Sequence, residues 1–383
     1  MRLYTKVILA ALSVFALASC HNEYHFPEDS VSRLFEAGKD GYHTYRIPAM
    51  VVTSKGTILA FTEARVGSHR DGAEKDIVLK RSSDNGKTWS DNIVVRTDSV
   101  QSCGNPVPIV MDNGRIVVFS LWSNRLKTKS WPLYDLKAFI QHSDDDGLTW
   151  SEAREVTVQQ PADSNWIMYA MGPGHGLQLS KGEHAGRLIV PCYHKWLDKD
   201  WKWQGRSFFM VSDDFGETWR QGAFASPGGN ECSATELSNG DIMLNMREFT
   251  RWREEHLVGN ESRRLVAISR DGGETLDPCR YDWGLPEPRC QGSIIRYKHG
   301  HENEDWLLFV NPSSVQKRYN LQVKLSKDGG HTWKAIYKAP FTMCAYSDIV
   351  ELTDGSVAII YEAGEETMRE CLAFDIIPAS WIK

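Results

Sequence analysis

One octapeptide recurs five times in this chain and constrains its fold more than any other feature. The copies follow the pattern S-x-D-x-G-x-T-W and begin at Ser82, Ser143, Ser212, Ser269 and Ser326; Leu276 replaces the tryptophan in the fourth. The aspartate can accept hydrogen bonds from the backbone of its own turn, and the glycine can adopt a positive φ. Each copy therefore predicts the same β-hairpin turn, with its tryptophan packed back onto the hairpin.

The spacing of the copies predicts the architecture. Their aspartates lie 61, 69, 57 and 57 positions apart, at Asp84, Asp145, Asp214, Asp271 and Asp328. Such a period fits four short strands with their loops, which is the size of one propeller blade. No segment has sustained helical periodicity, and hairpin signals such as Asn113-Gly114 lie between the copies. We predict an all-β, six-bladed β-propeller, closed by pairing of strands near residues 36–50 and 340–380.

The first 20 residues have the features of an export signal. A short charged start precedes an apolar run over residues 7–17, and Leu17-Ala18-Ser19-Cys20 resembles a bacterial lipobox. We predict a lipoprotein signal peptide over 1–20, lipidation of Cys20, a tether over 21–35 and a propeller over 36–383. The alternative is a plain secretory signal that is cut elsewhere. We expect an exported protein, held in the bacterial cell envelope (outer membrane or periplasm) only by its lipid.

Charge and cysteine content narrow the classes of ligand that this chain is expected to bind. The chain has 44 basic and 50 acidic residues and a formal net charge of −6, which argues against nucleic acid as a partner. An anionic ligand would therefore need a local arginine cluster. Eight cysteines are present, without zinc-type spacing, and we expect mostly buried thiols and neither a metal nor a cofactor.

Residues outside the repeats point to a family. The segment Gly41-Tyr42-His43-Thr44-Tyr45-Arg46-Ile47-Pro48 looks like the Y-R-I-P signature of exo-α-sialidases (neuraminidases), and the octapeptides resemble the Asp boxes of that family. Asp boxes also occur in unrelated propellers, but here they follow the signature. The similarity runs from about Leu34 to Ile377. It implies a six-bladed propeller, expected to be a monomer, that removes terminal sialic acids from glycoproteins, glycolipids and oligosaccharides.

The resemblance also implies how the sugar is bound. Sialic acid carries a carboxylate on its anomeric carbon, and arginine binds such a group bidentately. The family uses three arginines for this purpose, which match Arg46, Arg247 and Arg318. Glu362 matches a glutamate that orients the first of them, and Arg65, in a family-like E-x-R, would contact the 4-position of the sugar.

The same charge favours an unusual nucleophile. A carboxylate nucleophile would be repelled by the sugar's own carboxylate, whereas a tyrosine is neutral until a base removes its proton. Tyr346 matches the tyrosine of the family's Y-S-D motif, and Glu231 matches the glutamate that takes its proton, with Glu236 as the alternative. The resemblance thus implies a retaining enzyme with a tyrosyl-sialoside intermediate.

An aspartate after the first hairpin would be the acid/base. Asp71 lies between glycines six positions after Arg65, and Asp76 is the alternative. Tyr193 either lines the pocket for the glycerol or N-acetyl group or is a packed core tyrosine. Two other functions remain possible at this point: transfer of the sialyl group, including an intramolecular variant, and non-catalytic binding of sialoglycans.

Overall fold

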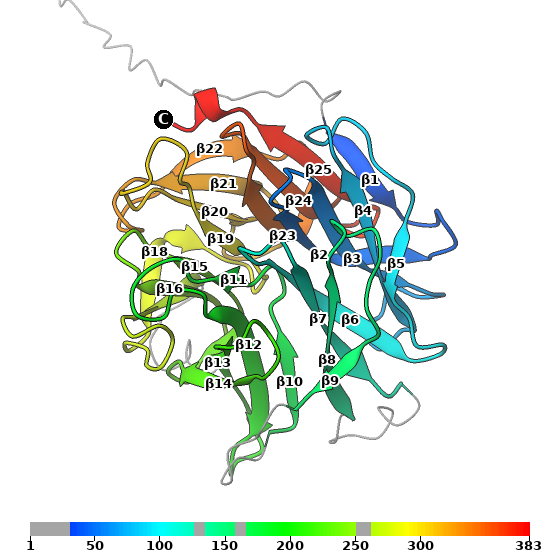
Figure 1. Cartoon of the computed structure of the whole chain (residues 1–383), viewed down its shortest axis with the longest axis horizontal. Coiled ribbons are helices and arrows are strands. Elements are labelled where there is room, and N and C mark those ends of the chain that lie inside the picture. The colour runs from blue at the N-terminus through cyan, green and yellow to red at the C-terminus, as the bar shows by residue number, and fades with distance from the viewer. Residues whose placement is uncertain (1–30, 126–134, 158–165, 250–261) are drawn as a thin grey trace, which may run out of the picture.

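The fold of the described residues is all-β. The computed structural model describes residues 31–125, 135–157, 166–249 and 262–383 (Figure 1). These segments contain 25 strands and one short 3₁₀ helix, η2 (Ala379–Trp381). The predicted signal peptide and Cys20 lie outside the described residues. Within the described part of the chain, no helix is long and apolar enough to cross a membrane.

The largest sheet has eight strands from the N-terminal part of the chain. Its strands are β2 (Thr44–Val52), β3 (Ile58–Arg65), β4 (Lys75–Ser82), β5 (Ile93–Arg96), β6 (Ser102–Val110), β7 (Ile116–Ser123), β8 (Leu136–Ser143) and β9 (Arg154–Val156). Its first four and last four strands form two antiparallel groups. A parallel pairing of Lys75 with Ser102 joins the two groups through β4 and β6.

The remaining strands form four sheets of four or five strands each. The five-stranded sheet contains β10 (Met168–Met171), β11 (Leu177–Gln178), β12 (Leu188–Leu197), β13 (Trp203–Ser212) and β14 (Arg220–Phe224). The next contains β15 (Gly229–Glu236), β16 (Ile242–Glu248), β17 (Arg263–Ser269) and β18 (Arg280–Pro286). It is followed by β19 (Ser293–Arg296), β20 (Leu307–Pro312), β21 (Leu321–Ser326) and β22 (Lys334–Lys338). The last contains β23 (Met343–Glu351), β24 (Val357–Gly364), β25 (Cys371–Ile377) and the N-terminal strand β1 (Ser32–Glu36).

The sheets are arranged around a central axis in a β-propeller (Figure 1). Contacts run from β2 to β6, then to β11, β15, β19 and β23, and from β23 back to β2. Antiparallel pairing of β1 with β25 joins the two ends of the described chain in one sheet. The predicted ring closure by N- and C-terminal strands is confirmed. The predicted tether boundary is wrong by a few residues, because Ser32 to Phe35 already belong to β1.

The hydrogen bonding divides the described strands into five sheets and not into the six separate blades that were predicted. Four sheets have the size of a blade, and the fifth has eight strands, because the parallel pairing of β4 with β6 merges two strand groups. Packing follows the ring: one apolar cluster joins Phe61 of β3 to Val118 of β7, and another joins Phe119 of β7 to Phe208 of β13. The core therefore lies between neighbouring strand groups, and its rigidity fixes the strands that face the axis.

All five octapeptides form the predicted turn. In the first, Oδ1 of Asp84 accepts the backbone N–H of Thr88 at 2.9 Å, and Oδ2 accepts the Thr88 hydroxyl at 2.6 Å. The other four repeat these bonds, and all five glycines have a positive φ. The tryptophans extend further than predicted. The Trp219 ring lies edge-on to Phe119 of the preceding strand group, 4.6 Å between centroids, so the repeat also links neighbours in the ring.

Candidate active site

The innermost strands carry β-bulges where the predicted site residues lie. Pairing shifts between Arg46 and Ala49 in β2, between Gly229 and Cys232 in β15, and between Cys344 and Ser347 in β23. A bulge bends its strand and changes the direction of a side chain. In β2 the irregularity coincides with a positive φ at Ile47, next to a proline that has no backbone N–H. The bulges therefore give Arg46, Glu231 and Tyr346 orientations that a regular strand would not allow.

Arg46 is held by a carboxylate from the other end of the chain. Its Nε and Nη2 donate to the two oxygens of Glu362 at 2.9 and 3.2 Å, although the residues are 316 positions apart. The Glu362 side chain is fully buried, and it also accepts the backbone N–H of Ile47. The Nη1 of Arg46 contacts Oδ1 of Asp71 at 3.2 Å. Glu362 thus orients Arg46 and leaves one of its nitrogens facing the Asp71 loop.

Arg65 lies next to Arg46 and shares its contact with Asp71. Its Nη1 donates to Oδ1 of Asp71 at 3.0 Å, while its Nε and Nη2 donate to Oε2 of Glu63. Lys75 donates to both oxygens of Glu63 from the next strand. Burial by itself would raise the pKa of Glu63, but Lys75 and Arg65 lower it to about 2. This buried group fixes the guanidinium that faces the site.

Tyr346, Glu231 and Arg247 form the centre of the arrangement. The Tyr346 hydroxyl donates a short hydrogen bond to Oε1 of Glu231, 115 positions away in the chain. Arg247 donates to Oε2 of Glu231 at 2.5 Å, and its Nη1 lies 3.3 Å from the Tyr346 hydroxyl. A phenol is thereby placed in direct contact with a carboxylate that can accept its proton.

The three predicted carboxylate-binding arginines surround Tyr346. The guanidinium carbons of Arg46 and Arg318 lie 5.4 and 5.3 Å from the centre of its ring. Arg318 is held by the backbone carbonyl of Arg289 at 2.8 Å. Since Arg247 contacts the Tyr346 hydroxyl, three guanidinium groups from distant parts of the sequence gather around one phenol.

The charges around the site shift its pKa values. Burial, followed by the charge of Glu231, raises the pKa of Tyr346 well above its ordinary value. Burial would also raise the pKa of Glu231, but Arg247 and the Tyr346 hydrogen bond lower it overall. Likewise, burial opposes the charges of Arg65 and Arg46, which hold the pKa of Asp71 below its usual value. These neighbouring cations therefore hold both carboxylates in the ionised form.

The two alternative carboxylates have other partners. Glu236 accepts the backbone N–H groups of Ser180 and Lys181, and Asp76 accepts the Tyr42 hydroxyl at 2.8 Å. Each anchors a loop, so the geometry favours Glu231 and Asp71. Tyr193 is 6% exposed, and its pKa is raised by burial and by the charge of Glu231. It is thus buried beside the site.

Comparisons with known proteins agree with this arrangement. Residues 48–359 match the BNR repeat-like domain family. The chain is 30% identical over 361 residues to sialidase-2 of Mus musculus, covering 85% of this chain and 90% of that protein. This chain belongs to the BNR-repeat exo-α-sialidase family. It is also 33% identical over 343 residues to the sialidase of Micromonospora viridifaciens, covering 85% of this chain and 51% of that one.

Solved structures of sialidases have the same fold. The Hadza microbial sialidase Hz136 superposes with a TM-score of 0.77 at 27% identity, covering 92% of this chain and 69% of that one. The intramolecular trans-sialidase of Ruminococcus gnavus has a TM-score of 0.74 at 19% identity, covering 92% and 98%. The chain spans 51% and 61% of the length of the Micromonospora viridifaciens and Bacteroides fragilis sialidases.

Some residues of this sialidase-family site were not assigned from sequence. Glu63 and Lys75 hold Arg65, and the i, i+2 spacing of Glu63 and Arg65 on one strand was a usable signal, because such residues share a face. Asp348 accepts the N–H of Met50, the Ser293 hydroxyl and a contact from Nδ1 of His175 at 2.8 Å. Two positions from Tyr346, it ties three elements together at the axis. No local pattern indicated these distant partners.

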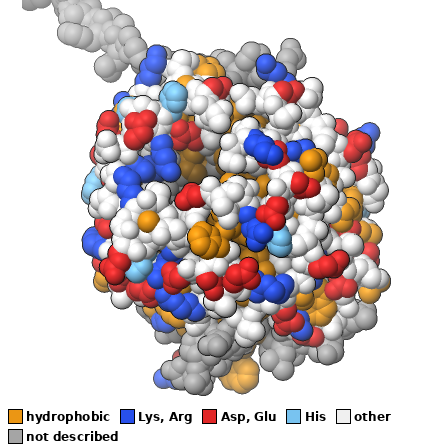
Figure 2. All heavy atoms as spheres, viewed as in Figure 1, with side chains coloured by type: hydrophobic (Ala, Val, Ile, Leu, Met, Phe, Trp, Pro, Cys, Tyr) orange, Lys and Arg blue, Asp and Glu red, His pale blue; other side chains and the backbone are white. Residues whose placement is uncertain are grey.

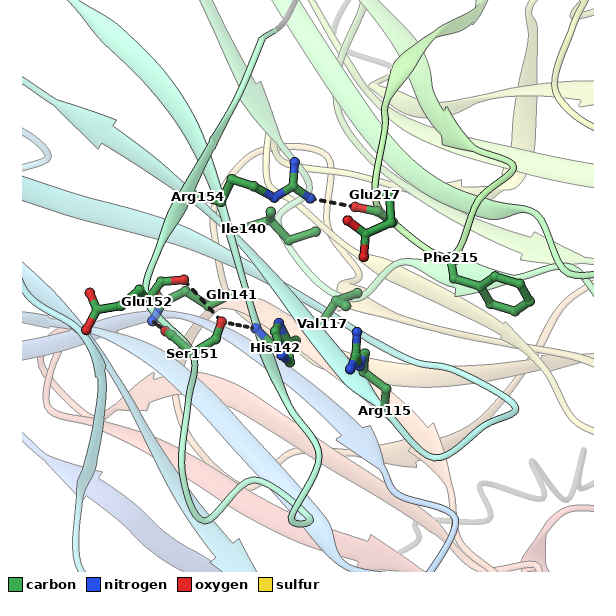
Figure 3. A pocket seen from close by; sticks show the side chains of 11 residues that line it. Arg115, Val117, Ile140, Gln141, His142, Ser151, Glu152, Arg154, Phe215 and Glu217 are labelled. Atoms are coloured by element: carbon green, nitrogen blue, oxygen red, sulfur yellow. Dashed lines mark hydrogen bonds between the residues drawn. The ribbon is translucent and has the colours of Figure 1, made fainter.

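One surface pocket lies away from this site. It has a volume of 230 Å³ and lies between β7, β8 and the third Asp box, with Val117, Ile140 and Phe215 among its lining residues (Figure 3). None of the predicted site residues lines it. Among the described residues, no group of three or more His, Cys, Asp or Glu could hold a metal ion. The seven cysteines in the described segments are free thiols, of which only Cys279 is not buried.

Proposed function

We propose that this chain is a retaining exo-α-sialidase that hydrolyses terminal sialic acids through a tyrosyl-sialoside intermediate. The observation that carries the proposal is the hydrogen bond from the Tyr346 hydroxyl to Glu231, with three arginines around it. A site that only bound the sugar would need the arginines but not this phenol–carboxylate pair. The proposed substrates are sialylated glycoproteins, glycolipids and oligosaccharides, as expected for the family.

Binding would begin with the carboxylate of the sugar. Arg46, Arg247 and Arg318 would hold it, and this holds the anomeric carbon near the Tyr346 hydroxyl. The hydroxyl attacks that carbon while Glu231 accepts its proton. Removing this proton matters because the pKa of Tyr346 is raised in the buried site.

Asp71 would act twice. It first protonates the leaving oxygen, and it then takes a proton from the water that attacks the same carbon, so that Tyr346 leaves and regains its proton from Glu231. Two inversions give overall retention. The substrate itself would prepare Asp71 for this role, because its carboxylate competes for Arg46 and thereby removes one of the two cations that hold Asp71 ionised.

The experiment is release of the leaving group from a chromogenic sialoside by the purified protein and by Tyr346→Phe. Without the nucleophile, kcat should fall on the order of 10⁴-fold. The phenyl ring keeps its packing, so the midpoint of thermal unfolding should barely change. Unchanged turnover in this variant would falsify the tyrosyl intermediate. Product analysis then separates hydrolysis from sialyl transfer. Hydrolysis releases the sialyl group as free sialic acid, whereas transfer leaves it in another compound.

The circuit of innermost strands supports a count of six blades. Six strands, β2, β6, β11, β15, β19 and β23, contact one another in turn around the axis. We interpret the eight-stranded sheet as two blades, β2–β5 and β6–β9, joined by the Lys75–Ser102 pairing. An experimental structure in which β4 and β6 do not pair would give six separate sheets.

The lipid anchor remains a proposal from sequence. We propose that Cys20 is the lipidated first residue of the mature chain and that the protein is held in the bacterial envelope by this lipid. Cys20→Ser should move the protein from the membrane fraction to the soluble fraction. If the variant stays in the membrane fraction, another attachment holds it.

A further inference from the structure

Two loops flank the place where the leaving group must lie. The first, residues 66–74 between β3 and β4, carries Asp71, whose side chain is 86% exposed. The second, residues 365–370 between β24 and β25, is anchored by Met368, which packs against Ile47, Ala345 and Tyr346. Since Asp71 must reach the leaving oxygen, the aglycone has to extend outward between or over these loops. Their exposed groups are therefore the ones that it can contact.

Two arginines and two histidines lie on these loops or next to them. His69 and Arg70 directly precede Asp71, and both are exposed. The His43 ring lies 6.5 Å from the His69 ring. The charge of Arg369, followed by burial and the charge of His43, holds the pKa of His69 below its usual value. We call the group His43, His69, Arg70 and Arg369 the cationic rim, in which Arg70 and Arg369 carry the positive charge.

The rim arginines are not neutralised by the protein. Among the described residues, no carboxylate forms an ion pair with Arg70 or Arg369, and the Nε of Arg369 is buried without a hydrogen-bond partner. This is notable in a chain of net charge −6, whose surface mixes acidic and basic side chains on the face drawn in Figure 2.

The acids on the loop of Arg369 are mostly turned to other partners. Glu370 accepts the backbone N–H groups of Glu366 and Thr367, and Glu365 accepts the Thr342 hydroxyl at 2.7 Å. The third acid of this segment, Glu366, is exposed. The two rim arginines therefore keep their positive charge on the loops that carry Asp71 and Met368.

We propose that the cationic rim binds an anionic group on the aglycone, so that the enzyme prefers sialosides with a second negative charge next to the scissile bond. This inference rests on the proposed function. The chemistry that fits is a carboxylate or a sulfate within one sugar unit of the leaving oxygen. A second sialic acid in a disialyl chain would supply the carboxylate, and a sulfated galactose would supply the sulfate. Guanidinium groups bind both anions bidentately.

The test compares kcat/KM for three substrates at low ionic strength. They are sialyllactose, a disialyl oligosaccharide and a sialyllactose sulfated on its galactose. For the full chain, kcat/KM for each substrate with an anionic aglycone is divided by kcat/KM for sialyllactose, whose lactose aglycone is uncharged. We expect a ratio above one for at least one anionic substrate, and a fall of that ratio by about tenfold in Arg369→Gln, the size of one charge-assisted contact. Arg369→Lys should restore most of it, because it keeps the charge.

Lys334→Gln is the matched control, since it removes an exposed cation from the outer strand β22. It should leave the ratio unchanged. Loss of the preference for only one anionic substrate in Arg369→Gln would support the proposal and identify the group that is recognised. A ratio that is equal in the original protein and in Arg369→Gln, or that falls equally in Lys334→Gln, would overturn it. If the original protein cleaves none of the three substrates, the proposed function is refuted instead.

Discussion

Carboxylates in the Asp boxes bind partners that are close in the sequence, whereas carboxylates at the axis bind partners that are far away in the sequence. Asp145 is satisfied by its own octapeptide, with hydrogen bonds from Ser143, Leu148 and Thr149. Glu231 and Glu362 instead bind groups 115 and 316 positions away. A box can therefore form as soon as its hairpin forms, whereas the site exists only when the ring is closed. Local contacts recur along the chain, and long-range contacts do not.

The two regions also lower a pKa for different reasons. Hydrogen bonds from the hydroxyl and backbone of Thr149 lower the pKa of Asp145 to about 2. At the axis, Arg247 lowers the pKa of Glu231 against the effect of burial. The box carboxylate is stabilised by dipoles that remain in place. The axial carboxylate depends on Arg247, which in the proposed function would also bind the carboxylate of the substrate. Changes at the axis are therefore expected to alter the chemistry, whereas changes in the boxes are expected to alter folding alone.

After Tyr346→Phe, the largest effect at the axis is expected for Asp71→Asn. Loss of a general acid should lower kcat/KM for sialyllactose by roughly 10²- to 10³-fold. An activated nitrophenyl leaving group needs less protonation, so its hydrolysis should suffer less. Both rates are measured on the same preparation. Equal losses on the two substrates would contradict the assignment of Asp71.

The same assignment fixes the pH dependence. Asp71 must be protonated and Glu231 ionised for the first step, and neighbouring arginines lower the pKa of each carboxyl group. The rate should therefore be highest at acid pH and fall as the pH rises and Asp71 loses its proton. In Asp71→Asn this alkaline fall in kcat/KM should disappear. If kcat/KM of the variant still falls at the same pH, a group other than Asp71 causes the alkaline fall.

Glu362→Gln should affect both folding and activity. The change removes the charge that pairs with Arg46 in a buried site, at a cost of about 3 kcal/mol in unfolding free energy. Because Arg46 is then less well oriented, the KM for a sialoside should also rise. Urea unfolding and steady-state kinetics measure the two effects. A variant with lowered stability and unchanged KM would show that Arg46 does not need Glu362 for its orientation.

The range of the contacts also explains what could be predicted from sequence. The boxes, the all-β class and the ring closure follow from local patterns, and the structure confirms them. The site residues came from a resemblance, and the structure brings Glu231 and the three arginines together around Tyr346. The parallel pairing that merges β4 and β6, and the support of Arg65 by Lys75, have no local signal. They depend on how separate strands meet in space.

Trp219→Leu tests the link that a box makes between neighbouring strand groups. The change copies Leu276, which occupies the same position in the fourth box. It removes the edge-on contact with Phe119 and the hydrogen bond from Nε1 to the Gly216 carbonyl. We expect a loss of about 2 kcal/mol in unfolding free energy, with kcat/KM nearly unchanged. A large fall in kcat/KM would show that the boxes also set the geometry at the axis.

Asp145→Ala should have the smallest effect. It removes an exposed set of turn hydrogen bonds that resembles a helix cap, which is worth about 1 kcal/mol. The pKa of Asp145 is lowered in the folded state, so its contribution to stability is present above pH 4 and is lost as the pH falls toward 2. The stability difference from the original protein should therefore shrink over that interval. Asp200→Ala, at an exposed hairpin tip, is the control and should change stability little at either pH. A difference that stays constant between pH 5 and pH 2 would mean that the aspartate stabilises its turn without its charge.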